Sequence, residues 1–281
     1  MLSQNQIKHI TALKVKKFRE EHHQFIAEGH KLVMDLISGD FNVSAIYASA
    51  EWIIDNLKRV REKNISVFET LPREMERISA LSTPSPVLAV VDIPSAHQHI
   101  STSSHQPIST LILALDDIRD PGNLGTIIRI ADWFGIDQVV CSESCVDIYN
   151  PKVVQATMGS IARVNIVRCN LVEFLSNHTG SVTPSGPYDK VPVYGTFLEG
   201  NSIFTQTLSD HGIIVIGNES RGISPDLVPF ITHKLFIPSF GSSDMGKAES
   251  LNASIATAII CAEFRRGHLS TPISVLQLNS F

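Results

Sequence analysis

The stretch GSSDMGKAES, residues 241–250, places two glycines five positions apart and a lysine, Lys247, directly after the second. This spacing is close to the G-x-x-x-x-G-K-[ST] loop, whose amides and lysine bind nucleotide phosphates. The apolar run LILALDD, residues 111–117, also ends in acidic residues, as the metal-binding strand of a nucleotide hydrolase does. However, Ala248 stands where that loop needs a magnesium-binding hydroxyl, and the stretch follows the last predicted strand instead of the first. A nucleotide hydrolase is therefore only the third alternative.

Three other stretches place glycines and polar side chains directly after apolar runs. They are DDIRDPGNLGTIIRIADWFG, VIGNESRGIS, and IPSF followed by ESLNASIATAI. In open α/β sheets, ligands bind outside the carboxyl ends of the strands, so these stretches form the candidate site. No G-x-G-x-x-G turn follows a predicted strand, and the sequence therefore gives no support for a dinucleotide site.

Together these stretches resemble the three motifs of the SpoU (TrmH) family of RNA ribose 2′-O-methyltransferases, within the SPOUT superfamily. Asn123 precedes Arg129 by six residues, Glu219 follows Gly217 by two, and SLN opens the last predicted helix. The resemblance covers about residues 110–266. It implies an α/β fold whose parallel sheet ends in a trefoil knot. It also implies methylation of a ribose in structured RNA, with rRNA as the first candidate and tRNA as the second.

The resemblance also implies a methyl donor, S-adenosylmethionine, and a role for each matching residue. The implied catalytic set is Asn123, Arg129, Glu219, Ser250 and Asn252. The implied donor-binding set is Thr196, Gly217, Ile237 and Leu251. Arg129 stands at the position of the family's proposed base, but a free guanidinium stays protonated. We therefore interpret Arg129 as a bidentate phosphate contact that orients the target nucleotide. No metal is expected.

Each of these residues also has a purely structural interpretation. Asn123 in DPGN fits a turn residue or a helix cap, and Ser250 fits the cap of the last helix. Arg129 would pair with Asp132 three residues on. Glu219 has the weakest structural alternative, because GNESRG directly after an apolar strand is an unusual place for mere solvation. The order of all three motifs along the chain favours the catalytic interpretation.

Basic residues are concentrated near the start of the chain, although its 281 residues carry a formal net charge of −5. The overall charge argues against nonspecific coating of nucleic acid, but a local patch can still bind RNA phosphates. The alternative is a solvated helix face. The residues that we predict to bind RNA are Lys14, Lys16, Lys17 and Arg19, together with Arg129.

A polar run rich in Ser and His separates two series of alternating helices and strands. We predict a small α/β RNA-binding domain at residues 1–93, a linker at residues 94–109 and the methyltransferase domain at residues 110–281. The first part resembles the RNA-binding domain that many family members carry. The linker histidines have no Cys or acidic partner nearby, so we expect no metal site there; they are His97, His99 and His105.

The four cysteines lack the paired spacing of a zinc site and are too sparse for a disulfide framework. The start has no apolar signal segment, and no apolar run reaches the length of a membrane span. We therefore expect a cytoplasmic protein, and the resemblance implies a homodimer. Residues 241–250 are predicted to be a mobile flap over the donor, with Lys247 dispensable for donor binding. A non-catalytic RNA-binding or ribosome-assembly factor with the same fold is the alternative of a different class.

Overall fold

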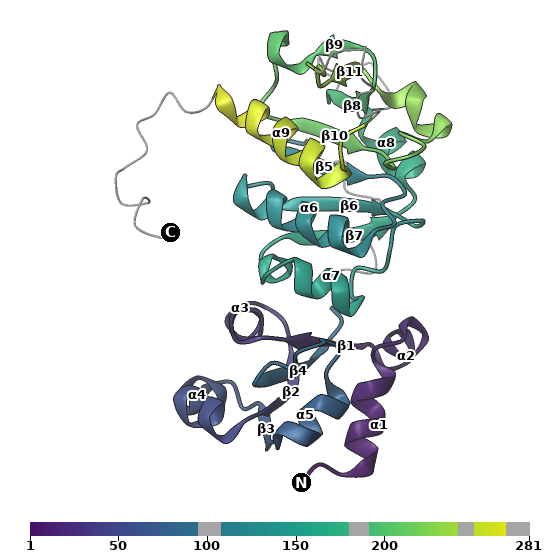
Figure 1. The fold of residues 1–281 in the computed structure, drawn as a ribbon. Coiled ribbons are helices and arrows are strands. Elements are labelled where there is room, and N and C mark those ends of the chain that lie inside the picture. The colour runs from purple at the N-terminus through teal and green to yellow at the C-terminus, as the bar shows by residue number, and fades with distance from the viewer. Residues whose placement is uncertain (95–107, 180–190, 241–249, 268–281) are drawn as a thin grey trace.

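The computed structural model describes residues 1–94, 108–179, 191–240 and 250–267. Two β-sheets, each covered by helices, lie one beyond the other along the molecule (Figure 1). The first sheet is built from the N-terminal part of the chain, and the second from the part after the predicted linker. No helix within these ranges is long and apolar enough to cross a bilayer.

The first sheet has four strands in the order β1-β4-β2-β3. Strand β4 is antiparallel to both of its neighbours, and β2 is parallel to β3. The strands are β1 Gln24–Glu28, β2 Val43–Ala48, β3 Ser66–Glu69 and β4 Val87–Asp92. The helices are α1 Gln4–Ala12, α2 Lys16–His22, α3 His30–Ser38, α4 Ala50–Glu62 and α5 Pro72–Ile78. The sequence of β1, QFIAE, is short, has polar residues at both ends and shows no alternation, and this strand was not predicted.

The second sheet has seven strands in the order β7-β6-β5-β10-β8-β11-β9. All of its neighbouring strands run parallel, which confirms the predicted parallel sheet. The strands are β5 Leu111–Leu115, β6 Gln138–Ser142, β7 Asn165–Cys169, β8 Val193–Phe197, β9 Asn201–Ser202, β10 Gly212–Ile216 and β11 His233–Phe236.

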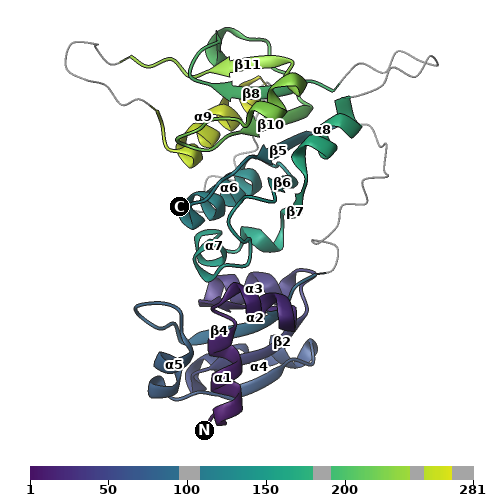
Figure 2. The same ribbon diagram turned by 90° about the vertical axis from the view of Figure 1, so that its right-hand side faces the viewer.

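Helices cover both faces of the second sheet (Figure 2). On one face are α6 Pro121–Trp133, α7 Pro151–Ala156 and α9 Ala253–Arg266. On the other are α8 Leu171–Thr179 and the 3-10 helix η4 Pro225–Phe230. Strand β5 is buried on both faces and sends alternate residues to each, which explains its continuous apolar sequence. Residues 225–230 form a 3-10 helix and not an α-helix, because Pro229 lies inside the segment and lacks the donor that an α-helix needs.

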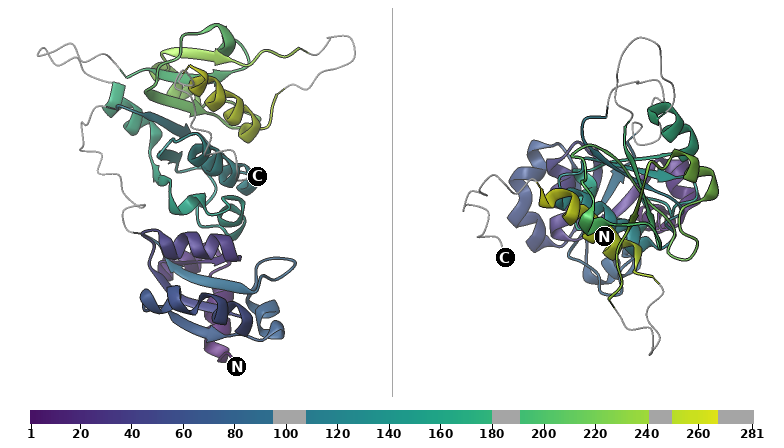
Figure 3. Two further views of the ribbon diagram at one scale, coloured as in Figure 1. Left: turned by 90° about the vertical axis from the view of Figure 1, so that its left-hand side faces the viewer. Right: turned by 90° about the horizontal axis from the view of Figure 1, so that it is seen from above.

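The N-terminal sheet lies beside α7 of the second unit (Figure 3), and side chains of the two units contact each other. The rings of Phe25 on β1 and Tyr149, which precedes α7, lie 4.8 Å apart between centroids. Arg19 on α2 is 2% exposed, and its guanidinium donates to the carboxylate of Asp147 at 2.5 and 3.0 Å. The N-terminal sheet is therefore held against the segment that leads into α7.

Candidate active site

The loop after β10 folds back on itself as a tight turn. Asn218 and Gly222 exchange both of their backbone hydrogen bonds, at 3.0 and 2.9 Å. A Cβ atom at Gly217 would lie 2.3 Å from the carbonyl carbon of Gly222, so a side chain at this position would force the turn apart. The turn presents Glu219 at the carboxyl edge of the parallel sheet.

Helix α6 brings Asn123 to the same edge. The carboxylate of Asp120 accepts the backbone N–H of Asn123 at 2.8 Å, and Pro121 occupies the first helical position, where a missing N–H costs nothing. Asp120 is thus the cap, and the interpretation of Asn123 as the cap is wrong. The Asn123 side chain instead donates from Nδ2 to Oε1 of Glu219 at 2.5 Å.

Helix α9 supplies the third member of the cluster. Oδ1 of Asn252 accepts the backbone N–H groups of Ser254 and Ile255, so Asn252 caps the helix, and not Ser250 as the structural alternative held. Its Nδ2 donates to Oδ1 of Asn123 at 2.8 Å. Side chains from all three motifs therefore form one hydrogen-bonded chain, Glu219–Asn123–Asn252.

A cavity of about 930 Å³ opens beside this chain. Its walls come from the ends of β8, β10 and β11 and from the start of α9. The predicted site residues that line it are Thr196, Gly217, Glu219, Ile237, Ser250 and Leu251. The Thr196 hydroxyl donates to the carbonyl of Val215 at 3.2 Å, so its hydrogen bond is used within the sheet.

Arg129 lies apart from this cluster, on the exposed side of α6. Within the part of the chain that the structure describes, its guanidinium has no hydrogen bond or ion pair. Asp132, the structural partner considered for it, binds Arg163 at 2.8 Å and the Ser160 hydroxyl at 2.7 Å instead. Burial raises the pKa of Asp132, but these two hydrogen bonds outweigh it and leave the pKa lowered. The structural alternative, in which Arg129 pairs with Asp132, is therefore wrong.

The basic residues near the start of the chain differ in how far their side chains are exposed. The side chain of Arg19 is buried where α2 faces Asp147 of the second unit, and it also donates to the carbonyl of Leu13 at 2.8 Å. The prediction that Arg19 contacts RNA conflicts with this burial and is withdrawn. Lys14 donates to the Ser79 carbonyl at 2.6 Å, while Lys16 and Lys17 are exposed.

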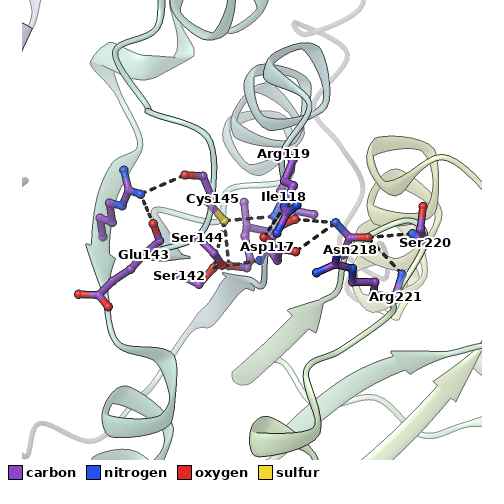
Figure 4. Close-up of polar contacts among 12 residues, drawn as sticks. Asp117, Ile118, Arg119, Ser142, Glu143, Ser144, Cys145, Asn218, Ser220 and Arg221 are labelled. Atoms are coloured by element: carbon purple, nitrogen blue, oxygen red, sulfur yellow. Dashed lines mark hydrogen bonds and ion pairs between the residues drawn. The ribbon is translucent and has the colours of Figure 1, made fainter. Parts of the chain in front are cut away.

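Two residues that the sequence analysis did not single out hold the motif loops together (Figure 4). Nδ2 of Asn218 donates to the backbone carbonyl of Asp117 at 2.9 Å, which joins the loop after β10 to the loop after β5. In the sequence, Asp117 is marked by the acidic pair that ends LILALDD. That pair resembled the end of a metal-binding strand, and nothing in it indicated a contact with the loop after β10.

The described residues contain no group of three or more side chains suited to hold a metal ion. The cysteines are free thiols, and three are buried, namely Cys141, Cys145 and Cys261. The Cys145 thiol accepts the N–H of Ile118 and donates to the carbonyl of Leu115, so it braces the start of the first motif. Residues 241–249 of the predicted flap, including Lys247, and the linker histidines lie outside the described residues.

Comparison with family models gives two matches. The SpoU rRNA Methylase family matches residues 110–262. The MRM3-like substrate binding domain matches residues 4–89.

Among named relatives, the chain is 28% identical to the 23S rRNA (guanosine(2553)-2′-O)-methyltransferase RlmP of Bacillus subtilis (strain 168), over 90% of this chain and 93% of that protein. It is 34% identical to the mitochondrial rRNA methyltransferase 3 of Xenopus laevis over 56% of this chain, and spans 38% of that longer protein.

Two solved structures are similar over nearly the whole chain. A TrmH-family protein from Porphyromonas gingivalis is 37% identical with a TM-score of 0.78, covering 95% of this chain and 99% of that one. An AdoMet-bound rRNA methyltransferase from Sinorhizobium meliloti is 29% identical with a TM-score of 0.80, covering 96% and 97%. The matched range contains every residue of the Glu219–Asn123–Asn252 chain. The protein belongs to the SpoU rRNA methylase family, and the trefoil-knotted α/β fold follows from that membership.

Proposed function

We propose that this protein transfers a methyl group from S-adenosylmethionine to a ribose 2′-hydroxyl of rRNA. The observation that carries the proposal is the meeting of Glu219, Asn123 and Asn252 beside the cavity. The names of the relatives support the same reaction, since RlmP of Bacillus subtilis is a 23S rRNA 2′-O-methyltransferase. The relative from Sinorhizobium meliloti was solved with AdoMet bound.

The cavity fits a donor of this kind. Its volume lies within the range of about 300–1,000 Å³ that is typical of small-molecule sites. Apolar walls such as Ile237 and Leu251 suit an adenine ring, and the carboxylate of Glu219 and the hydroxyl of Ser250 add polar groups. Thr196, Gly217, Ile237 and Leu251 would hold the donor, which when bound supplies an electrophilic methyl carbon on a sulfonium.

The catalytic residues of this chain act mainly by positioning. Methyl transfer to a hydroxyl is an in-line displacement, which depends on how the reacting atoms are held. Asn123 uses both ends of its amide, and Asn252 holds it in that orientation. Oε1 of Glu219 is fixed by this contact, so its other oxygen can contact the target nucleotide. Arg129 contacts an RNA phosphate and orients the ribose.

We propose that the protein is a homodimer in which Arg129 acts on the partner's site. Trp133 lies one turn beyond Arg129 on α6 and is 75% exposed, and Ile255 on α9 is 53% exposed. Helices α6 and α9 pack against each other, so these apolar side chains lie on neighbouring helices. A second copy packed on them would cover apolar surface and would bring each Arg129 towards the other chain.

Mixing two inactive variants tests where Arg129 acts. If it acts across the interface, Arg129→Ala and Glu219→Gln chains will form mixed dimers with one intact site and one doubly altered site. Random exchange should then restore about a quarter of the wild-type activity. If Arg129 acts within its own chain, the mixture will stay inactive. Sedimentation of each variant confirms that the dimer forms, and a fully active wild-type monomer would contradict the dimer.

We also propose a division of labour between residues 1–93 and residues 110–281, joined by a linker at 94–109. The first part would bind RNA, which the match to a substrate binding domain supports. Lys16 and Lys17 are exposed there and would contact phosphates, and Lys14 lies at the edge of the same surface. A protein that acts on rRNA and carries free thiols fits a reducing compartment, so we propose the cytoplasm.

The proposed reaction is tested by transfer of a tritiated methyl group to rRNA from a strain that lacks this protein. Wild-type protein and an exposed control, Glu62→Gln, should label the RNA, whereas Glu219→Gln should label it at least about a hundredfold more slowly. Protein that binds the rRNA without labelling it would instead support the non-catalytic assembly factor. Mapping the labelled ribose identifies the nucleotide.

A further inference from the structure

Asp117 holds an unusual backbone conformation at the end of β5. Its φ is +56°, in the left-handed region that aspartate visits far less often than glycine does. The residue is 7% exposed. Its N–H donates to the Ser142 hydroxyl at 2.9 Å, and its carbonyl accepts from Nδ2 of Asn218 at 2.9 Å (Figure 4). These contacts hold the residue in that conformation.

Through these contacts, Asp117 connects the carboxyl ends of three adjacent strands. Ser142 ends β6, Asp117 follows β5, and Asn218 follows β10, and these strands are neighbours in the order β6-β5-β10. Oδ1 of Asn218 also accepts the backbone N–H groups of Ser220 and Arg221, at 2.9 and 3.1 Å. The turn that carries Glu219 is therefore fixed to Asp117 through one amide.

The carboxylate of Asp117 has a second task, because its Oδ1 accepts from Nε of Arg119 at 2.8 Å. The Arg119 side chain is 59% exposed. Within the described part of the chain, its two terminal nitrogens have no hydrogen-bond partner. The hydrogen bond that Arg119 donates to Asp117 raises the pKa of Arg119, so the guanidinium stays charged. A buried carboxylate thus orients a cation that points to solvent.

Arg119 also stands next to the catalytic cluster in the chain. Asp120 follows it and caps α6, and Asn123 lies in the first turn of that helix. Glu219 in the cluster and the nearby cap Asp120 carry carboxylates, which would repel an RNA strand that approached them. A cation at this place would offset the repulsion and attract the strand.

We propose that Arg119 contacts a backbone phosphate of the RNA strand that carries the target ribose, and that Asp117 is its positioning residue. The inference rests on the proposed function. Nε is occupied by Asp117, and the terminal nitrogens form a fork that matches two phosphate oxygens. Because Asp117 also holds the Glu219 turn through Asn218, one residue would set the distance between the phosphate contact and the methyl-transfer site.

The test is Arg119→Ala, with Arg266→Ala as the matched control. Arg266 is likewise exposed and paired with a carboxylate, that of Glu263, but it lies at the far end of α9. For Arg119→Ala we expect the KM for rRNA to rise roughly ten- to hundredfold, as for the loss of a charged hydrogen bond. The affinity for S-adenosylmethionine in calorimetry should not change. Arg266→Ala should match the wild type in every measurement.

The salt dependence of RNA binding separates a phosphate contact from a structural role. Loss of one phosphate contact lowers the slope of log K against log salt concentration by about 0.7–0.9. Arg119→Ala should show this reduction. A slope equal to that of the wild type would overturn the proposal and leave Arg119 as a partner that neutralises Asp117.

Asp117→Asn tests the positioning role. Asparagine tolerates the left-handed conformation and keeps the carbonyl contact with Asn218, but it loses the charge that orients Arg119. We expect Asp117→Asn to raise the KM for rRNA about as much as Arg119→Ala, and the double variant to add little to either. Additive effects would show that the two residues act separately. If the wild type labels no RNA, the proposed function fails; if the wild type is active but these variants match it, only this inference fails.

Discussion

Asn123 is the residue on which the site depends. Its amide donates to Glu219 and accepts from Asn252, so it uses the two ends of the group for two different motifs. An amide has a donor and an acceptor at this spacing, whereas an ionised carboxylate has acceptors alone. Its backbone N–H is taken by Asp120, which leaves the side chain entirely for these contacts. An asparagine at this place is therefore a chemical requirement of the cluster.

Asn123→Asp tests this requirement with almost no change of shape. The new carboxylate would face the Glu219 carboxylate at 2.5 Å, the present distance between Nδ2 and Oε1. Two ionised carboxylates at this distance repel each other, so the pair would lose its orientation until one of them binds a proton. At neutral pH we expect turnover to fall at least about a hundredfold, with partial recovery as the pH is lowered. Methyl-transfer rates from pH 5 to 8 measure this, and an unchanged, pH-independent rate would contradict it.

The sequence predicted the members of this cluster better than it predicted their neighbours. Motif order pointed to Asn123, Glu219 and Asn252 because each stands at a fixed place after a buried strand or at a helix start. A run of charged residues does not indicate which of its side chains point to solvent. For this reason Arg19 was expected on the surface, although it is buried. The role of Asp117 was not predicted, because two consecutive acidic residues do not indicate that one of them has a left-handed backbone conformation.

At the scale of elements, buried parallel strands were easy to predict and short elements were not. Continuous apolar runs such as LILAL and GIIVI correspond to β5 and β10, at the centre of the sheet. The two-residue strand β9 has no room for a pattern, and η4 kept a helical pattern that its internal proline prevents from forming an α-helix. The conformation of β9 depends on its pairing with β11, which its own two residues do not reveal.

The contact between α6 and α7 makes a prediction at this scale. A Cβ atom at Gly125 would lie 2.5 Å from that of Ala156 and 2.6 Å from the carbonyl oxygen of Val153. Gly125→Ala would gain roughly 0.5–1 kcal/mol of helix propensity, but overpacking costs about 1–3 kcal/mol. We therefore expect net destabilisation, and reduced activity because Asn123 lies on the same helix.

Urea unfolding measures this effect against a glycine with space around it. A Cβ atom at Gly267, just after α9, would meet no atom within 4 Å, and its backbone is right-handed. Gly267→Ala should therefore be neutral or slightly stabilising. If Gly125→Ala were as stable as this control, the two helices would not be as closely packed as the structure shows.

At the scale of the whole molecule, the first sheet is fixed to the second through two sets of charged contacts of different kinds. Arg19 and Asp147 are 2% and 16% exposed, whereas Arg163, which joins Asp35 to Asp132, is 46% exposed. The sequence suggested two units and a linker but carried no sign of these contacts, since each joins residues 128 positions apart. Removing the first unit would therefore expose Tyr149 and leave Asp147 without its partner. Single substitutions are for this reason a better test than truncation of what each unit contributes to function.

The two contacts should differ widely in what they contribute. Removing one partner of a buried ion pair costs about 3–5 kcal/mol, because the other charge is left without compensation. An exposed pair contributes about 0.2–1 kcal/mol. We therefore expect Arg19→Ala to lower the free energy of unfolding by several times more than Arg163→Ala does. The combined variant Arg19→Met/Asp147→Leu should recover part of the loss, because it removes both charges at once. Urea unfolding of the four proteins measures this, and equal losses in the two single variants would show that Arg19 is no more important than a surface charge in holding the first sheet against the second.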